Sequence, residues 1–276
     1  MPGPKRFFLC ADDFGQSEAI SLGIVDLLQS RRLSATSVMT RSPRWPGDAA
    51  LLRDLGPDCA IGLHLDLTHP THQPMGGLGR LLVLSHLRLL SRRDLERTFH
   101  EQIDRFTQAM GRLPDFLDGH QHVHAWPQIR EAFASLIKRH WPCTQAPRQA
   151  PWVRATDRLV GQTDTPVKGW VVRFSSRGFS QRMAGLGVPV SRAFGGLYAL
   201  SGRPVRPLLE SWLQDLPDGT WLMMHPGRPS LSDQSDPIAA ARAVEYEHLR
   251  SDAFLSDLDR AGASVFRGSL DLLPKG

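Results

Sequence analysis

Acidic and histidine side chains recur in four short motifs of this 276-residue chain, and each motif contains or follows an apolar run. They comprise Asp12 and Asp13 in FFLCADDFG, His64 in IGLHL, Asp118, His120, His122 and His124 in DGHQHVH, and His225 in MMHPG. A carboxylate with two imidazoles is a common ligand set for a divalent ion that keeps open positions for water and substrate. Such an ion lowers the pKa of bound water and polarises a carbonyl oxygen. The motifs therefore predict hydrolysis of an amide or ester, with zinc as the first candidate ion.

Each of these residues also has a structural explanation that needs no metal. A histidine inside an apolar strand, such as His64, is more often a core residue held by hydrogen bonds than a ligand. Adjacent aspartates before a glycine, as at Asp12 and Asp13, are also common in turns. The three histidines of residues 120–124 give the stronger signal, because alternate side chains of an extended segment point to one face. One of the three would suffice as a ligand, which leaves the others to orient carboxylates or contact substrate.

Alternating strands and helices are needed to bring these motifs together, and the hydrophobic pattern predicts them. Strands are expected at residues 7–11, 34–40, 59–65, 115–118, 152–155, 220–224 and 263–267. Helices are expected at residues 17–28, 47–55, 95–110, 126–139 and 205–216. One more helix is expected to begin at Asp236 and Pro237, which suit the N-cap and first helical positions. This alternation predicts parallel βαβ units and an α/β fold, a (β/α) barrel that is either complete or incomplete. The motifs then lie at the carboxyl ends of strands, where such folds place their chemistry.

Length and composition favour one enzyme domain over residues 1–276. Hydrophobic residues make up 41% and charged residues 22% of the chain, as in ordinary soluble proteins. Within the domain we expect a lid-like insertion at about 66–91 and an irregular region at about 141–200, since neither shows a clear period. No apolar run approaches the roughly 18 residues of a membrane span, and the apolar start is too short for a secretory signal. The cytoplasm is therefore the expected location.

The charge balance narrows the classes of partner. The chain has 33 basic and 28 acidic residues, a net charge of +5, and its basic residues gather partly at 31–44 and 80–105. A solvated surface explains this mild excess best, and anionic lipid headgroups or a phosphate-bearing substrate come second. No nucleic acid is expected, because no nucleic-acid module is recognisable. The three cysteines, Cys10, Cys59 and Cys143, predict reduced, buried thiols.

Taken in order, ADDFG, GLHL, DGHQHVH and MMHPG resemble the motifs of the YdjC-like carbohydrate deacetylases, the ChbG/HpnK family. The resemblance implies a divalent-metal amidase, on a barrel related to the polysaccharide deacetylases, that removes acetyl groups from N-acetylated amino sugars. It implies that Asp13, His64 and His120 bind one ion, zinc or magnesium, and that Asp12 is the general base. His225 would then protonate the departing amine.

Other roles follow less directly from the resemblance. Related deacetylases pair the base with an arginine, and Arg154 in PWVR is the candidate, with a purely structural arginine as an equal alternative. His122 and His124 are expected to orient the ligands or contact the substrate. The loop at 66–91 is rich in Leu and Arg. It leaves open whether the sugar is a free oligosaccharide or is linked to a lipid or a nucleotide.

Two other functions would use the same residue types. A metal-dependent phosphoester hydrolase would normally hold two ions about 3.5–4 Å apart, with more carboxylates than are evident here. A non-catalytic sugar-binding protein would keep its function without the Asp12 carboxylate. Contact with a membrane surface and a homodimer stay open as further partners of the chain.

Overall fold

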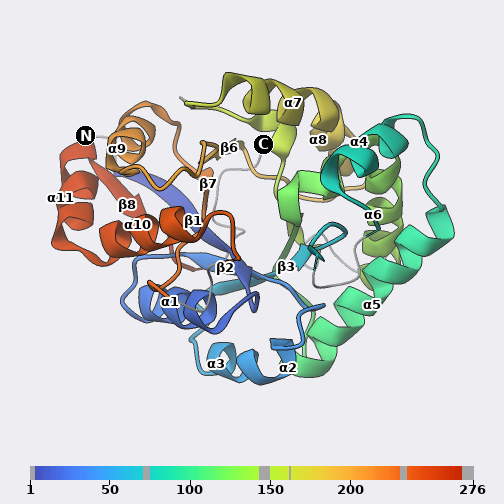
Figure 1. Cartoon of the computed structure of the whole chain (residues 1–276), viewed down its shortest axis with the longest axis horizontal. Helices are drawn as coiled ribbons and strands as arrows, with labels where there is room; N and C mark the ends of the chain where they lie inside the picture. The colour runs from blue at the N-terminus through green and yellow to red at the C-terminus, as the bar shows by residue number, and fades with distance from the viewer. Residues whose placement is uncertain (1–3, 71–74, 143–149, 162, 231–234, 269–276) are drawn as a thin grey trace.

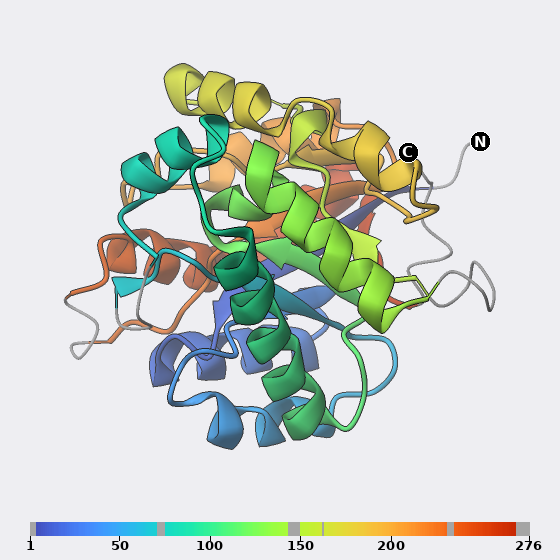
Figure 2. The ribbon, with the colours of Figure 1, turned by 90° about the vertical axis from the view of Figure 1, so that its right-hand side faces the viewer.

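The computed structural model describes residues 4–70, 75–142, 150–161, 163–230 and 235–268, and Figures 1 and 2 show it from two directions. Eight parallel strands form one sheet in the order β5-β4-β3-β2-β1-β7-β6, with β8 paired to β1. The strands are β1 (Lys5–Phe14), β2 (Ala35–Val38), β3 (Ala60–Leu65), β4 (Phe116–Gly119), β5 (Trp152–Val153), β6 (Ala193–Gly195), β7 (Thr220–Met224) and β8 (Ala263–Val265). A single bridge between Val153 and Val190 connects β5 to the segment that leads into β6. The predicted α/β fold, an incomplete (β/α) barrel, is confirmed.

Helices surround the sheet and connect successive strands (Figure 1). They are α1 (Glu18–Gln29), α2 (Trp45–Asp48), α3 (Ala50–Arg53), α4 (Leu78–His86), α5 (Arg92–Met110), α6 (Pro127–His140), α7 (Pro166–Ser176), α8 (Phe179–Ala184), α9 (Arg206–Asp215), α10 (Ala239–Arg250) and α11 (Asp252–Ala261), with the 3-10 segments η2 (His120–Ala125) and η4 (Thr156–Arg158). Their ends follow local signals in the sequence. Ser17 caps α1 by accepting a hydrogen bond from the Ile20 backbone N–H, and Gly111 ends α5 in the left-handed conformation.

Alternation of side chains along the strands creates two apolar layers. In β1, Phe7 and Leu9 belong to the large outer core that includes the apolar faces of the helices, whereas Phe8 points into the barrel. The inner layer includes Phe8, Cys10, Phe116, Trp152, Phe194, Trp221 and Met223. Its rings contact one another closely, with the Trp221 ring centre 4.3 Å from that of Phe8 and 4.8 Å from that of Phe116. This aromatic layer is the floor beneath the candidate site.

Several segments differ from the sequence expectations in detail. Residues 47–55 do not form one helix, because a turn at Ala49 separates α2, which begins at Trp45, from α3, which ends at Arg53. The expected lid-like insertion at 66–91 contains α4, and the expected irregular region at 141–200 contains α7 and α8 with short strands. The apolar runs in these segments are short and lie between glycines and prolines, so they show no clear helical or strand period.

Two of the cysteines are free and buried, as predicted, and the third, Cys143, lies outside the described residues. Burial raises the pKa of the Cys10 thiol well above its usual value, so this residue is not a ready nucleophile. Within the described part of the chain, no helix combines the length and the apolar character that a bilayer span requires.

Candidate active site

A layer of polar side chains lies directly above the inner aromatic layer. Its members are Asp12 after Cys10 in β1, His64 after Gly62 in β3, Asp118 after Phe116 in β4, Arg154 after Trp152 at the end of β5, and His225 after Met223 at the end of β7. Each lies two positions beyond an inward-pointing residue, so the alternation of the strand points it inward as well. Gly62 leaves room for the floor, since a Cβ atom there would lie 2.2 Å from the Phe116 ring. The sheet itself therefore positions most of the candidate site.

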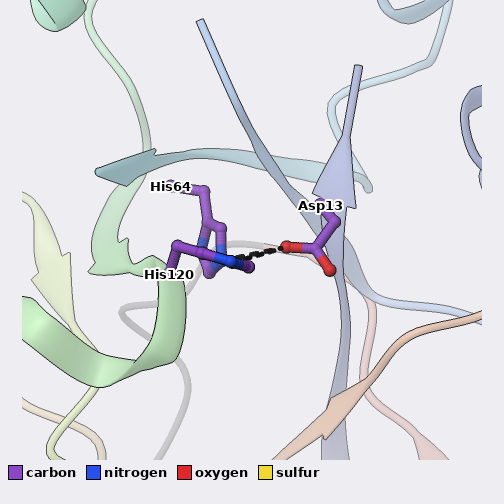
Figure 3. A group of neighbouring side chains, drawn as sticks. All are labelled: Asp13, His64 and His120. Carbon is purple, nitrogen blue, oxygen red and sulfur yellow. Dashed lines mark hydrogen bonds and ion pairs between the residues drawn. The ribbon is translucent and has the colours of Figure 1, made fainter. Parts of the chain in front are cut away.

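Asp13 departs from this alternation and faces two histidines. Its backbone has a φ of 68°, a left-handed conformation that is uncommon for a residue other than glycine. Its Oδ1 atom lies 3.0 Å from Nδ1 of His120 and 3.4 Å from Nε2 of His64 (Figure 3). The structure thus brings together three residues from β1, β3 and η2 that are far apart in the sequence.

These three donors fit a divalent ion. The ligand atoms of Asp13, His64 and His120 all lie within 4.8 Å of one another. Bonds of about 2.0–2.2 Å to a central ion place neighbouring donors about 3–3.5 Å apart, which matches the distances from Asp13 Oδ1 to the two rings. Two imidazoles and one carboxylate also leave positions free for water and substrate.

Asp118 orients His64 from the side opposite Asp13. Its Oδ1 atom lies 2.7 Å from Nδ1 of His64, and the Ser37 hydroxyl donates a hydrogen bond to the same oxygen. Burial opposes a charge on the His64 ring, but Asp118 and Asp12 outweigh it and raise the pKa of His64 to about 10. The ring is therefore protonated at neutral pH and holds Nε2 toward Asp13.

Arg154 binds both aspartates of the polar layer. Its fully buried guanidinium donates to the two oxygens of Asp12 at 2.6 Å each and lies 2.6 Å from Oδ2 of Asp118. Cys10, Asp12 and Asp118 form a second group of close donor atoms, and Arg154 contacts all three residues. Because the arginine already balances this negative charge, the group is a poor site for a second ion.

Arg242 of α10 is a site residue that the motifs did not reveal. It is buried, donates a hydrogen bond to Oδ2 of Asp13 at 2.8 Å, and is itself held by Asp236 at 2.6 Å. Burial opposes ionisation of Asp13, but Arg242 and His120 hold the pKa of Asp13 well below its usual value. One oxygen of Asp13 is thus fixed while the other faces the histidines. No local pattern marks Arg242, because it reaches Asp13 from 229 positions further along the chain.

The histidines of residues 120–124 do not point to one face, and that prediction was wrong. They lie in η2, where Gln121 and His122 have left-handed backbones with φ of 53° and 63°. The alternation of an extended segment is therefore lost. His120 faces Asp13, whereas the ring of His122 lies edge-on to Phe194, with 5.3 Å between ring centres.

The ring of His124 is fully buried between Phe133 and Phe179. Its Nε2 atom lies 3.0 Å from the backbone carbonyl of Arg154, so it ties η2 to the segment that carries the arginine. Burial lowers the pKa of His124 to about 4, and the ring is neutral at physiological pH. Of the two roles expected for His124, this enclosed position favours orienting the site over contact with substrate.

His225 follows β7 and lies at the side of the site near α10. It is partly exposed, but burial of its ring lowers the pKa of His225 to about 4. Its backbone N–H donates to Glu245, which also accepts a hydrogen bond from the Tyr198 hydroxyl at 2.6 Å. Burial raises the pKa of Glu245 to about 7. Glu245 and Tyr198, neither of which any motif indicated, therefore position the loop that carries His225.

Comparison with known proteins gives a consistent family match. The family model described as YdjC-like protein matches residues 6–260. A carbohydrate deacetylase of Danio rerio is 31% identical over 153 residues, which are 50% of this chain and 48% of that protein. A chitooligosaccharide deacetylase of Serratia marcescens is 34% identical over 145 residues, 47% of this chain and 56% of that one. These matches span about half the length of each relative.

A more distant relative and a solved structure extend the likeness over more of the chain. A carbohydrate deacetylase of Mus musculus is 25% identical over 258 residues, 82% of this chain and 79% of that protein. The crystal structure of a candidate cellobiose-phosphate cleavage protein of Enterococcus faecalis superposes with a TM-score of 0.70 at 19% identity, over 99% of this chain and all of that one. The latter likeness shows a shared fold.

Proposed function

Since this chain belongs to the YdjC-like protein family, we propose that it is a metal-dependent hydrolase that removes an N-acetyl group from an amino sugar. The observation that carries the proposal is the meeting of Asp13, His64 and His120 beside the pair of Asp12 and Arg154. The names of the relatives from Danio rerio and Serratia marcescens, a carbohydrate and a chitooligosaccharide deacetylase, support the same chemistry. The sugar would be a free oligosaccharide or one linked to a lipid or a nucleotide.

Asp13, His64 and His120 would hold one divalent ion. Zinc suits two imidazoles and a carboxylate well, and magnesium is the second candidate. When bound, the ion supplies a Lewis acid that activates a water molecule and polarises the acetamide carbonyl. Arg242 would keep Asp13 ionised and correctly turned, and Asp118 would do the same for His64.

Asp12 would take the proton of the attacking water. Its Oδ2 atom lies 4.0 Å from Nε2 of His64, a separation that supports a role for this carboxylate beside the proposed ligands. Arg154 binds both oxygens of Asp12 and so fixes the plane of the carboxylate. Holding the base in one orientation is the contribution that a buried bidentate arginine can make to proton transfer.

His225 would give a proton to the departing amine. Its pKa of about 4 means that the ring is neutral at physiological pH. The ring would therefore take up, within the turnover, the proton that Asp12 removes from the attacking water and pass it to the amine. Glu245 contributes by holding the backbone N–H of His225, so that the ring faces the polar layer.

His122 would line the substrate side of the site. Its Nδ1 atom is buried without a hydrogen-bond partner among the described residues. The His122 ring would have to turn for a sugar hydroxyl to supply that partner, because the atom is closed to solvent. His124 is left out of this role because its ring is enclosed in the core.

Acetate release from a panel of N-acetylated glycans, glycolipids and nucleotide sugars tests the proposal directly. We expect release that a chelator abolishes and that added zinc or magnesium restores. Metal content per chain should be one ion, because Arg154 occupies the centre of the second group of donors. Phosphate release with two ions per chain would favour a phosphoester hydrolase instead. Sugar binding with no product would favour a binding protein.

A further inference from the structure

Two neighbouring segments of the surface expose an unusual number of large apolar side chains. Among the described residues, seven of the ten exposed side chains of this kind lie in residues 78–93 and 166–177. The first segment is α4, the turn that follows it and the first two residues of α5, and the second is α7 with its C-cap residue Arg177. Val83, Leu87 and Leu89 of the first segment and Val167, Trp170 and Phe174 of the second are between 55% and 76% exposed. Large apolar side chains that gather in one exposed patch usually mark a site of interaction.

The two segments form one continuous face, which we call the α4/α7 face. The His86 ring of α4 stacks on Phe174 of α7 with 6.0 Å between ring centres, and Trp170 stacks on Phe174 at 5.2 Å. Both views show α4 and α7 side by side, at the upper right in Figure 1 and at the upper left in Figure 2.

The same face is strongly basic. Residues 78–93 and 166–177 contain seven Lys or Arg residues and no Asp or Glu. These charges exceed the net charge of +5 for the whole chain, so the rest of the chain is net negative. One of the seven, Arg92 at the start of α5, forms an ion pair with Glu96 at 2.9 Å, while α7 carries Lys168 and Arg173 and ends at its C-cap Arg177. A partner that buries these apolar side chains and pairs with these cations would be both apolar and anionic.

We propose that the α4/α7 face docks on the surface of a lipid bilayer that contains anionic phospholipids. Aliphatic side chains and a tryptophan can enter the boundary between headgroups and acyl chains, while arginine and lysine attract the negative headgroups. A second copy of this chain fits less well, because a two-fold interface would set the same cationic face against itself. Nucleic acid would leave Val83, Leu87 and Val167 without apolar partners.

The face borders the candidate site, although the docking proposal stands independently of the proposed function. Lys168 of α7 donates a hydrogen bond to the backbone carbonyl of Tyr198 at 3.4 Å, and Tyr198 in turn bonds Glu245 beneath His225. α7 also contacts η2, the segment that carries His120. A docked protein would therefore hold its site close to the lipid headgroups.

The tryptophans provide a built-in probe of docking. Trp170 is 64% exposed, whereas the other six tryptophans, all within the described residues, are at most 9% exposed. We expect its emission to shift to the blue when vesicles of phosphatidylcholine with phosphatidylglycerol are added to the full-length protein. Vesicles of phosphatidylcholine alone should cause a much smaller shift, and high salt should reverse it. Trp170→Phe should still sediment with the anionic vesicles while losing the fluorescence change.

Paired substitutions separate docking from general charge effects. Each cation near an anionic surface strengthens binding by roughly fivefold, so Arg173→Gln with Arg177→Gln should weaken vesicle binding by at least about tenfold. The matched control, Arg31→Gln with Arg53→Gln, removes two exposed charges outside the α4/α7 face, one just after α1 and one at the end of α3, and should have little effect. For the apolar part, Val167→Gln should weaken binding and Leu255→Gln on α11 should not.

Three results would overturn the proposal. The first is equal binding to vesicles with and without phosphatidylglycerol. The second is equal binding by the variant that lacks Arg173 and Arg177 and by its control variant. The third is self-association, or binding of DNA or RNA, that Val167→Gln abolishes while the vesicles are ignored. Activity assays are not needed for any of these outcomes, so failure of docking is distinguishable from failure of the hydrolase proposal.

Discussion

The buried pair of Asp12 and Arg154 allows catalysis to be separated from ion binding. Asp12→Asn keeps the shape of the side chain but removes the charge that accepts a proton. We expect kcat for acetate release to fall by a factor on the order of 10²–10⁴, with metal content unchanged, because general-base catalysis contributes about that much. Acetate assays and elemental analysis of the purified variant measure the two quantities.

A surface pair of the same geometry provides the control for that substitution. Asp218 accepts side-chain hydrogen bonds of 3.2 and 2.8 Å from the Arg6 guanidinium at the amino end of β1, whereas Asp12 lies near the carboxyl end of that strand. Asp218→Asn removes an equivalent carboxylate and should leave kcat close to that of the unmodified protein. If Asp12→Asn turns over at the rate of Asp218→Asn, Asp12 is not the base.

Asp118 should affect ion binding rather than proton transfer. Its carboxylate holds Nδ1 of His64 at 2.7 Å and so directs Nε2 toward Asp13. Substitution of groups that orient a metal ligand typically weakens the metal by 10–100-fold, and we expect a loss of that size for Asp118→Asn. Competition with a chelator of known affinity measures it. An unchanged affinity would mean that Ser37 and the strand suffice to orient the ring.

At the scale of elements, the turn η2 decides which histidine reaches the site. Gln121 is exposed and left-handed, with a φ of 53°. Gln121→Gly removes that strain, whereas Gln121→Val adds a β-branched side chain where it is least tolerated. The Val variant should lose about 1–2 kcal/mol of unfolding free energy and bind metal more weakly, because His120 is displaced. The Gly variant should match or exceed the stability of the unmodified protein. Thermal unfolding with and without zinc compares the two, and equal behaviour would show that the turn is not strained.

The strands explain why much of the site was predictable. Asp12, His64 and His225 each follow an apolar run, and the end of a buried strand is a place that sequence patterns show well. The prediction for the histidines of residues 120–124 was wrong, because the same short sequence is compatible with an extended segment and with a left-handed turn. Arg242 could not be found, because its contact with Asp13 exists only after α10 has packed against the barrel.

At the scale of the whole molecule, ion binding should be linked to the release of a proton. Because the pKa of His64 is about 10, the ring carries a proton at neutral pH that the ion must displace. The apparent affinity for zinc should therefore rise with pH, by up to about tenfold per unit, until the pH approaches that pKa. Calorimetry at one pH in buffers of different ionisation enthalpy counts the protons released. A count near one is expected, and a count of zero would exclude His64 as a protonated ligand.

The stability of the ion-free protein should pass through a maximum near neutral pH. The raised pKa of His64 contributes stability below the ordinary histidine pKa of about 6.5, and this is lost as the pH rises toward 10. His124 behaves in the opposite sense. Its pKa is about 4 in the folded protein, so the unfolded chain takes up a proton first and stability falls as the pH drops from about 6.5 toward 4.

The acid side of this maximum can be assigned to His124 by substitution. Between pH 7 and pH 5, its titration should remove about 2 kcal/mol of unfolding free energy. His124→Gln keeps a hydrogen-bond donor for the Arg154 carbonyl but does not titrate, so its unfolding free energy should fall less over the same range even if the variant is less stable overall. Urea denaturation in the presence of a chelator measures the slope, with His86→Gln on the α4/α7 face as the control. If His124→Gln and His86→Gln give the same slope, the buried ring is not the group that sets the acid limit, and the neutral histidines nearer the site must be responsible.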